Sequence, residues 1–196
     1  MVPKKLDDLR LAPVRRWRVP YVIEAAVAVV LRDGPSEPEL LLVKRAVRAG
    51  DPWSGDMALP GGRRGTGDVD LLATAIREAH EEVGLVLTRA ACRGALTPVV
   101  TLARRHARLT PMVVTPIVFV VHGEPALHLN HELAAARWVP LAAFSQRAEK
   151  TSRPWRVLGF QLSAPAWQLG DDVVWGLTHQ MLTRLVRALR AGHRSR

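Results

Sequence analysis

The stretch LPGGRRGTGDVDLLATAIREAHEEVGL, residues 59–85, decides the fold of this chain because it joins a glycine-rich turn to an amphipathic helix. At about 100° per residue, Glu78, Glu81 and Glu82 fall within one arc of a helical wheel. The apolar side chains that fall together on another arc are Leu72, Ile76, Ala79 and Val83. The spacing therefore predicts a helix over about residues 70–83 that faces a core on one side and presents three carboxylates on the other.

Residues that commonly begin and end helices flank this segment. Asp68 or Asp70 can cap the first turn, and Gly84 can adopt the left-handed conformation that ends a helix. The three carboxylates repel one another, and a divalent cation would relieve that repulsion. Ligands made only of oxygen suit Mg²⁺ or Mn²⁺, and neither the single Cys92 nor a nearby histidine pair offers a zinc-like alternative.

The turn before the helix is suited to close approach by phosphate groups. Pro60, Gly61 and Gly62 allow a tight turn whose exposed N–H groups can meet phosphate oxygens. A solvated acidic face and a simple turn are the alternative interpretations of the two features. Their combination, with Arg77 placed to pair with Glu81 four residues later, favours a site for metal and diphosphate.

This segment resembles the Nudix box, the signature of hydrolases that split nucleoside diphosphates linked to another moiety. The matching residues are Arg77, Glu78, Glu81, Glu82, Gly84 and Leu85, after Gly62. The resemblance implies an α/β/α sandwich with a mixed β-sheet between helices. The chain departs from the general pattern twice, because Gly62 lies one residue too far from Arg77 and Val69 stands where the pattern has Glu. Asp68 and Asp70 flank that position and could substitute.

The longer spacing, with an acid near Asp68, is similar to the Nudix branch that includes coenzyme A diphosphatases. Residues 41–62, LLVKRAVRAGDPWSGDMALPGG, are similar to a second motif of that branch. The matching positions are Arg45, Ala46, Gly55, Pro60, Gly61 and Gly62. Residues 138–141 and 173–182 also resemble this branch, so the resemblance covers most of residues 21–190.

The resemblance implies roles for the acidic residues and for Arg77. Glu78 and Glu82 are expected to be the principal metal ligands. Glu81 is expected to be a third ligand or the group that orients and deprotonates water. Arg77 is expected to buttress these catalytic carboxylates. Glu132 resembles a position that some Nudix enzymes use for acid chemistry, although a surface carboxylate is the favoured interpretation.

Substrate contacts are expected from residues that precede the helix. Arg45 and Lys44 are candidates for clamping phosphate oxygens, with plain solvent exposure as an alternative of equal weight. Gly61 and Gly62 are candidates for direct approach of the diphosphate. Trp53 is a candidate for stacking on adenine, and packing beneath its own loop is the alternative.

These features predict a hydrolase that uses Mg²⁺ or Mn²⁺ and water to split the diphosphate of a nucleotide derivative, with coenzyme A or acyl-CoA favoured. ADP-ribose, a dinucleotide or a nucleoside triphosphate is the alternative substrate. A Nudix-fold regulator that binds a nucleotide without cleaving it is a further alternative. The three acidic residues argue against that regulator, and Val69 leaves room for it.

Composition fits one domain, predicted over residues 21–190, with an N-terminal extension over 1–20 and a basic tail over 191–196. A chain of 196 residues with 48% hydrophobic content can bury a sizeable core. The first residues lack the apolar core of a signal peptide, and the longest apolar run is too short to cross a bilayer. With Cys92 as its single cysteine, the protein is expected to be cytoplasmic and to have no membrane partner.

The net charge of +10 raises the question of a polyanionic partner. Arginine supplies most of it, because the only lysines are Lys4, Lys5, Lys44 and Lys150. No aromatic-rich RNA motif or helix-turn-helix pattern accompanies the charge, so nucleic acid is a minority interpretation and a small nucleotide-diphosphate substrate suffices. The resemblance is compatible with a homodimer.

Strands are expected over residues 21–32 and 39–45, in a short segment ending at Leu59, and within 85–102, 111–122 and 134–139. Residues 113–121 are too continuously apolar for an exposed strand, which predicts a central one. A last helix is expected over about residues 172–191. Residues 147–170 mix proline, tryptophan and charge without a period, and they are expected to form a loop or a lid over the substrate.

Overall fold

The fold is described from a computed structural model that covers residues 6–15, 21–49, 53–105, 108–144, 150–157 and 160–191. At its centre, strands β1 (Ile23–Asp33) and β7 (Arg108–Val121) run parallel, in register from Ile23 opposite Met112 to Arg32 opposite Val121. Both strands are apolar over most of their length, as expected for strands covered on both faces. The predicted central strand within residues 113–121 is therefore confirmed.

Antiparallel strands extend this pair into a mixed sheet of eight strands. The other members are β2 (Pro38–Arg45), β3 (Met57–Ala58), β4 (Gly61–Arg63), β5 (Cys92–Ala95), β6 (Val99–Arg105) and β8 (Leu133–Pro140). The order is β3-β2-β1-β7-β5, with β4 also paired to β1, β6 to β7 and β8 to β2. The glycine-rich β4 is thereby attached directly to the central strand.

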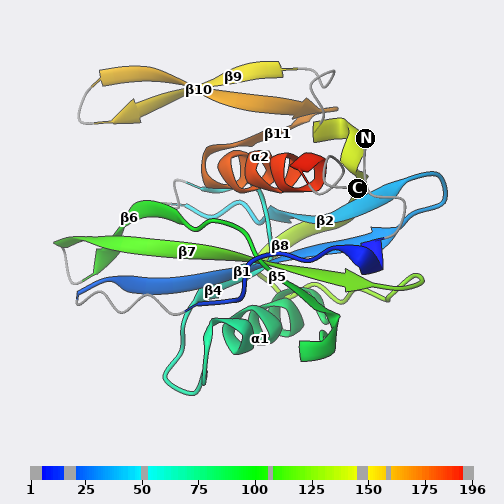
Figure 1. Ribbon diagram of the computed structural model, residues 1–196. Coiled ribbons are helices and arrows are strands. Elements are labelled where there is room, and N and C mark those ends of the chain that lie inside the picture. The colour runs from blue at the N-terminus through cyan, green and yellow to red at the C-terminus, as the bar shows by residue number, and fades with distance from the viewer. Residues whose placement is uncertain are drawn as a thin grey trace.

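Two helices cover opposite faces of the sheet (Figure 1). Side chains alternate along β1, because successive residues of a strand point to opposite faces. Ala26, Ala28 and Val30 pack with helix α1 (Leu71–Val83), whereas Val27, Val29 and Leu31 pack in the core that includes helix α2 (Gly176–Ala191). The expected α/β/α sandwich with a mixed sheet is confirmed.

A second sheet lies on the outer side of α2 (Figure 1). It consists of β9 (Lys150–Val157), β10 (Phe160–Leu169) and β11 (Asp172–Trp175), in the order β11-β10-β9. The expectation of a loop over residues 147–170 is wrong where the structure describes the segment, because β9 and β10 form an antiparallel hairpin. The last helix also begins later than expected, since residues 172–175 pair with β10 before Gly176 takes a positive φ of 61°.

Three short 3-10 helices complete the description: η1 (Leu6–Asp8), η2 (Arg89–Ala91) and η3 (Leu141–Phe144). Part of the predicted N-terminal extension packs on the sheet edge, where Leu6 is buried and Ala12 bridges to Ala95 of β5. Nearly all of the predicted basic tail lies outside the described residues. Across the described ranges, the helices are too short or too polar to cross a membrane.

Candidate active site

Helix α1 has the two ends that its sequence predicts. Asp70 is the N-cap, and its side chain accepts a hydrogen bond of 2.7 Å from the Ala73 N–H. Gly84 has a φ of 69°, and its N–H donates to the His80 carbonyl at 2.9 Å. Because glycine adopts this left-handed conformation without steric strain, the helix ends immediately after its row of acids.

Asp68 supplies the acid that is absent at position 69. Its carboxylate accepts hydrogen bonds from Arg77 Nε at 3.0 Å and Nη2 at 2.9 Å, and from the Gly65 N–H at 2.8 Å. These donors lower the pKa of Asp68 to about 2, with Arg77 as the largest cause. Val69 is 78% exposed. The additional residue in this turn therefore moves the buried acid one place earlier along the chain.

Arg77 joins the helix to the turn. Its Nη1 lies 2.8 Å from Glu78 Oε1 and 2.8 Å from Glu81 Oε2. Its Nη2 donates to the Arg63 carbonyl of β4 at 3.2 Å, in addition to Asp68. The carboxylates of Asp68 and Glu78 raise the pKa of Arg77. The guanidinium thus holds acidic side chains from the turn and the helix in fixed positions.

Glu78 and Glu82 press against the glycines of the turn. Glu82 Oε2 accepts a hydrogen bond of 3.1 Å from the Gly61 N–H. A Cβ atom at Gly62 would lie 2.6 Å from Glu78 Oε1, so a larger residue there would displace this carboxylate. Gly61 has a φ of 156°, and a Cβ there would lie 2.5 Å from the Ala26 carbonyl of β1.

The surroundings of these two carboxylates disfavour their charged forms. Burial is the main cause that raises the pKa of Glu78. The pKa of Glu82 is raised to about 7, chiefly by burial and also by the neighbouring carboxylates of Glu78 and Glu132, against the lowering effect of the Gly61 N–H. A cation bound between Glu78 and Glu82 would offset both the burial and the repulsion.

The donors fit a hard divalent cation, because Glu78 and Glu82 offer carboxylate oxygens beside a turn that leaves space for water or substrate oxygens. Glu81 is placed differently, with its side chain 52% exposed and held by Arg77. In the part of the chain that the structure describes, no three or more His, Cys, Asp or Glu side chains converge as a ready metal cage. Two protein carboxylates, completed by water and substrate oxygens, are the donor set that this arrangement supports.

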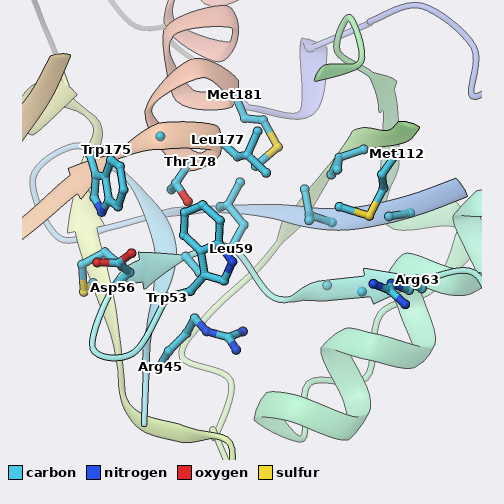
Figure 2. Close-up of a pocket in the computed structure, with 18 residues that line it drawn as sticks. Arg45, Trp53, Asp56, Leu59, Arg63, Met112, Trp175, Leu177, Thr178 and Met181 are labelled. Carbon is cyan, nitrogen blue, oxygen red and sulfur yellow. The ribbon is translucent and has the colours of Figure 1, made fainter. Parts of the chain in front are cut away.

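A cavity of about 260 Å³ opens on the other side of the same turn (Figure 2). Its sheet-side lining is Ala25 and Val27 of β1 with Met112 and Val114 of β7, and its helix-side lining includes Thr178 and Met181 of α2. Gly61 and Gly62 belong both to this lining and to the contacts of Glu82 and Glu78. A ligand in the cavity would therefore lie next to the two half-buried carboxylates.

Comparison with known proteins identifies the family. A profile of the NUDIX domain matches residues 22–158. The chain belongs to the Nudix family. It is 38% identical over 110 residues to an uncharacterised protein of Schizosaccharomyces pombe. The aligned region covers 55% of this chain and 33% of that protein. It is 37% identical over 120 residues to NudL of Cronobacter sakazakii, named an uncharacterised Nudix hydrolase, with coverage of 61% and 58%.

The chain thus spans between a third and three-fifths of the length of these two relatives. Among solved structures, a MutT/nudix family protein from Enterococcus faecalis superimposes with a TM-score of 0.60 at 17% identity. That match covers 90% of this chain and 65% of the other. Its low identity supports the Nudix fold alone.

The Nudix fold brings most of the predicted substrate residues to one place. Arg45, Trp53, Gly61 and Gly62 all line the cavity; Figure 2 labels Arg45 and Trp53. Lys44 is placed elsewhere, with its Nζ 2.8 Å from Asp172 Oδ1. The phosphate role of Arg45, Gly61 and Gly62 and the stacking of Trp53 on adenine stay predictions. The position of Lys44 favours a structural link between β2 and β11.

Other residues reach this Nudix site without a signal in the sequence. Trp155 and Trp175 join Trp53 in a cluster, with ring centroids 5.2 Å apart for Trp53 and Trp155, and 5.0 Å apart for Trp155 and Trp175. Arg153 lies 4.7 Å from the centre of the Trp175 ring and contacts Asp56 at 2.5 Å. Residues 153–155 lie on β9, a strand that the sequence did not predict because its apolar and polar residues do not alternate regularly.

Glu132 is also closer to the site than its sequence context indicated. Its carbonyl accepts a hydrogen bond of 2.8 Å from the Ala46 N–H, next to Arg45 of the cavity lining. Its carboxylate is among the groups that raise the pKa of Glu82. Its side chain is exposed, as the surface interpretation expected, yet it is near enough to act on the acidic cluster electrostatically.

Proposed function

We propose that this chain is a hydrolase that uses Mg²⁺ or Mn²⁺ to split the diphosphate linkage of a nucleotide derivative, and that the substrate is coenzyme A or an acyl-CoA. The observation that carries the proposal is the pair of half-buried carboxylates, Glu78 and Glu82, packed against the Gly61-Gly62 turn where the cavity opens. The long spacing through Asp68 and the motif over residues 41–62 support coenzyme A as the substrate.

The proposed chemistry is attack of water on one phosphorus of the diphosphate. Glu78 and Glu82 would hold a divalent cation, which would neutralise phosphate charge and make the attacking water more acidic. Gly61 and Gly62 let the diphosphate approach the backbone, and Arg45 and Arg63 of the cavity lining can bind its oxygens. As the new P–O bond forms, the bridging P–O bond breaks and the leaving phosphate keeps the electron pair.

The proton released by the attacking water needs a nearby carboxylate. Glu81 is our candidate, because it lies on the same helix as the two metal-binding carboxylates. Arg77 holds it in place, with Nη1 of Arg77 2.8 Å from Oε2 of Glu81. Glu132 is a second candidate, on the evidence of its electrostatic effect on Glu82. Arg77 is a positioning residue in this scheme, since its contacts are with acids of the helix and turn.

A substrate panel tests activity and specificity together. The purified chain is incubated with Mg²⁺ or Mn²⁺ and coenzyme A, acetyl-CoA, ADP-ribose, a diadenosine polyphosphate or a nucleoside triphosphate. We expect coenzyme A or its ester to be cleaved fastest, to a phosphopantetheine and an adenosine bisphosphate identified by mass. Faster cleavage of another nucleotide would reject the coenzyme A assignment, and binding without turnover would indicate a nucleotide-binding protein instead.

The metal-ligand assignment is tested by Glu82→Gln, which keeps the size of the side chain and removes its charge. We expect its turnover to fall at least about a hundredfold. Removing a residue that only hydrogen-bonds to a metal ligand already lowers metal affinity or activity about 10–100-fold, and loss of a ligand should cost at least as much. Glu124→Gln, at an exposed carboxylate of the loop after β7, is the matched control and should keep wild-type turnover. Full activity in Glu82→Gln would contradict the assignment.

A further inference from the structure

The β9–β10 hairpin extends well beyond the start of α2. Trp175, at the end of β11, pairs with Ala166 of β10, and β10 begins six residues earlier at Phe160. At roughly 3.3 Å per residue, the hairpin reaches about 20 Å past that pair. Figure 1 shows this free end projecting past the turn from β11 into α2. Gly176, at that turn, lines the cavity.

One face of this hairpin is directed at the cavity. Directly paired residues of antiparallel strands lie on the same face, and so do residues two apart along one strand. Trp155 pairs with Leu162, so these two share a face with Phe160. Trp155 packs on Trp53 and Trp175, which both line the cavity. The face that carries Leu162 and Phe160 is therefore the cavity side.

Beyond the tryptophans, this face is apolar and exposed to solvent. Leu162 is 54% exposed and Phe160 is 73% exposed. Together with Trp155 they form a continuous apolar surface, which we term the hairpin strip (Trp155, Leu162 and Phe160). Because large exposed apolar groups in a row are uncommon without a binding role, the strip needs an occupant.

The strip is held in a fixed position relative to the cavity. Arg153, two residues before Trp155, contacts the buried Asp56 at 2.5 Å and stacks over Trp175. Asp56 directly precedes β3, and it lines the cavity. The same lining is rich in apolar side chains, including Met57, Leu59 and Met181. An apolar route thus continues from the cavity along the underside of the hairpin.

We propose that the hairpin strip binds the acyl chain of an acyl-CoA substrate and makes hydrolysis selective for long chains; this rests on the proposed function. With the diphosphate at the Gly61-Gly62 turn, a pantetheine arm that leaves the cavity past Trp155 would carry the acyl group attached to its thiol end toward Leu162 and Phe160. An elongated apolar chain is the occupant whose shape and chemistry match a narrow apolar row that begins at a catalytic cavity.

A chain-length series tests the strip. The kcat/KM values for coenzyme A, acetyl-CoA, hexanoyl-CoA and dodecanoyl-CoA are compared in the wild type, in Phe160→Ser and in Leu162→Ser. We expect kcat/KM of the wild type to rise with chain length. In either variant the ratio of dodecanoyl-CoA to coenzyme A should fall about tenfold, the usual effect of losing a few apolar contacts in specificity. Leu109→Ser, at a 64% exposed leucine of β7, should keep the wild-type ratio.

Binding by equilibrium dialysis separates failure of this proposal from failure of the proposed function. If acyl-CoA esters are hydrolysed without dependence on chain length, the strip proposal is overturned and the function stands. If no coenzyme A ester is hydrolysed, the proposed function fails. In that case tighter binding of dodecanoyl-CoA than of coenzyme A, lost in Leu162→Ser but not in Leu109→Ser, would support the strip, and equal binding would overturn it.

Discussion

At the scale of single residues, Glu82 has the most unusual environment among the acids of α1. Its pKa is raised from an ordinary value of 4.5 to about 7, chiefly by burial. A carboxyl group whose pKa is higher in the folded state stabilises the fold at low pH and loses that contribution as pH rises through the folded value. The full rise in this pKa corresponds to a change of about 3 kcal/mol in the free energy of unfolding.

We therefore expect the metal-free protein to lose up to about 3 kcal/mol of unfolding free energy between about pH 4.5 and 7 through this group alone. Glu82→Gln removes the titration, so its stability relative to the wild type should rise over that interval. Thermal or urea unfolding with a chelator, from pH 5 to pH 8, measures the difference. Parallel pH profiles for the two proteins would show that Glu82 titrates normally.

Gly62 gives a second prediction at this scale. Alanine at this position would place Cβ 2.6 Å from Glu78 Oε1, so the carboxylate must move. We expect Gly62→Ala to lower kcat at least about tenfold, since a displacement near 1 Å in a catalytic group costs as much or more. Gly67→Ala is the matched control, because a Cβ there meets nothing within 4 Å. Equal activity of both variants would argue against a role for Glu78 at the turn.

At the scale of elements, the turn and α1 form one unit through Asp68 and Arg77. The box pattern places its first acid at position 69, but that side chain points to solvent, and the side chain of Asp68 is 6% exposed. Sequence reasoning left Asp68 and Asp70 as alternatives, because both are acids at plausible positions. The structure separates them, since Asp70 caps α1 and also contacts Arg89.

Asp68→Asn should therefore destabilise the fold by about 1–3 kcal/mol, because Arg77 loses a paired carboxylate in a largely buried position. Adding Val69→Glu, which restores the acid of the general pattern, should not recover this loss. The free energy of unfolding of the single and double variants measures both effects. Recovery of wild-type stability by the added Glu would mean that the turn can shift by one residue.

At the scale of the whole molecule, the site lies where the layers of the sandwich meet. Helix α1 brings the carboxylates from one face of the sheet, while α2 and Trp175 of β11 help to line the cavity on the other. The glycines of β4 connect the two sides, because β4 pairs with the central strand β1. A ligand bound at this junction stabilises the folded chain as a unit.

Metal binding should accordingly raise global stability. At a Mg²⁺ concentration of about 100 times its Kd, the free energy of unfolding is expected to increase by about 2.7 kcal/mol. Glu78→Gln should abolish most of that increase, and Glu124→Gln should retain it. Urea unfolding at pH 8, with and without Mg²⁺, measures both. An equal increase in Glu78→Gln would place the cation elsewhere.

The sequence by itself determined the features that depend on neighbouring residues. The period of α1 and its end at Gly84 are local patterns, and so is the apolar run that predicts β7 as a central strand. The family also follows from a contiguous motif. The pairing of β9 with β10 was not predictable in this way, because their residues show no clean alternation of apolar and polar side chains.

Only the tertiary structure decided the contacts between residues far apart in the chain. Trp53, Trp155 and Trp175 meet because three separate segments end beside one cavity. The position of Lys44 beside Asp172, and the nearness of Glu132 to Glu82, likewise depend on how strands pair across the sheet. A local pattern specifies which face of an element is apolar, but the packing of the whole chain selects the element that covers it.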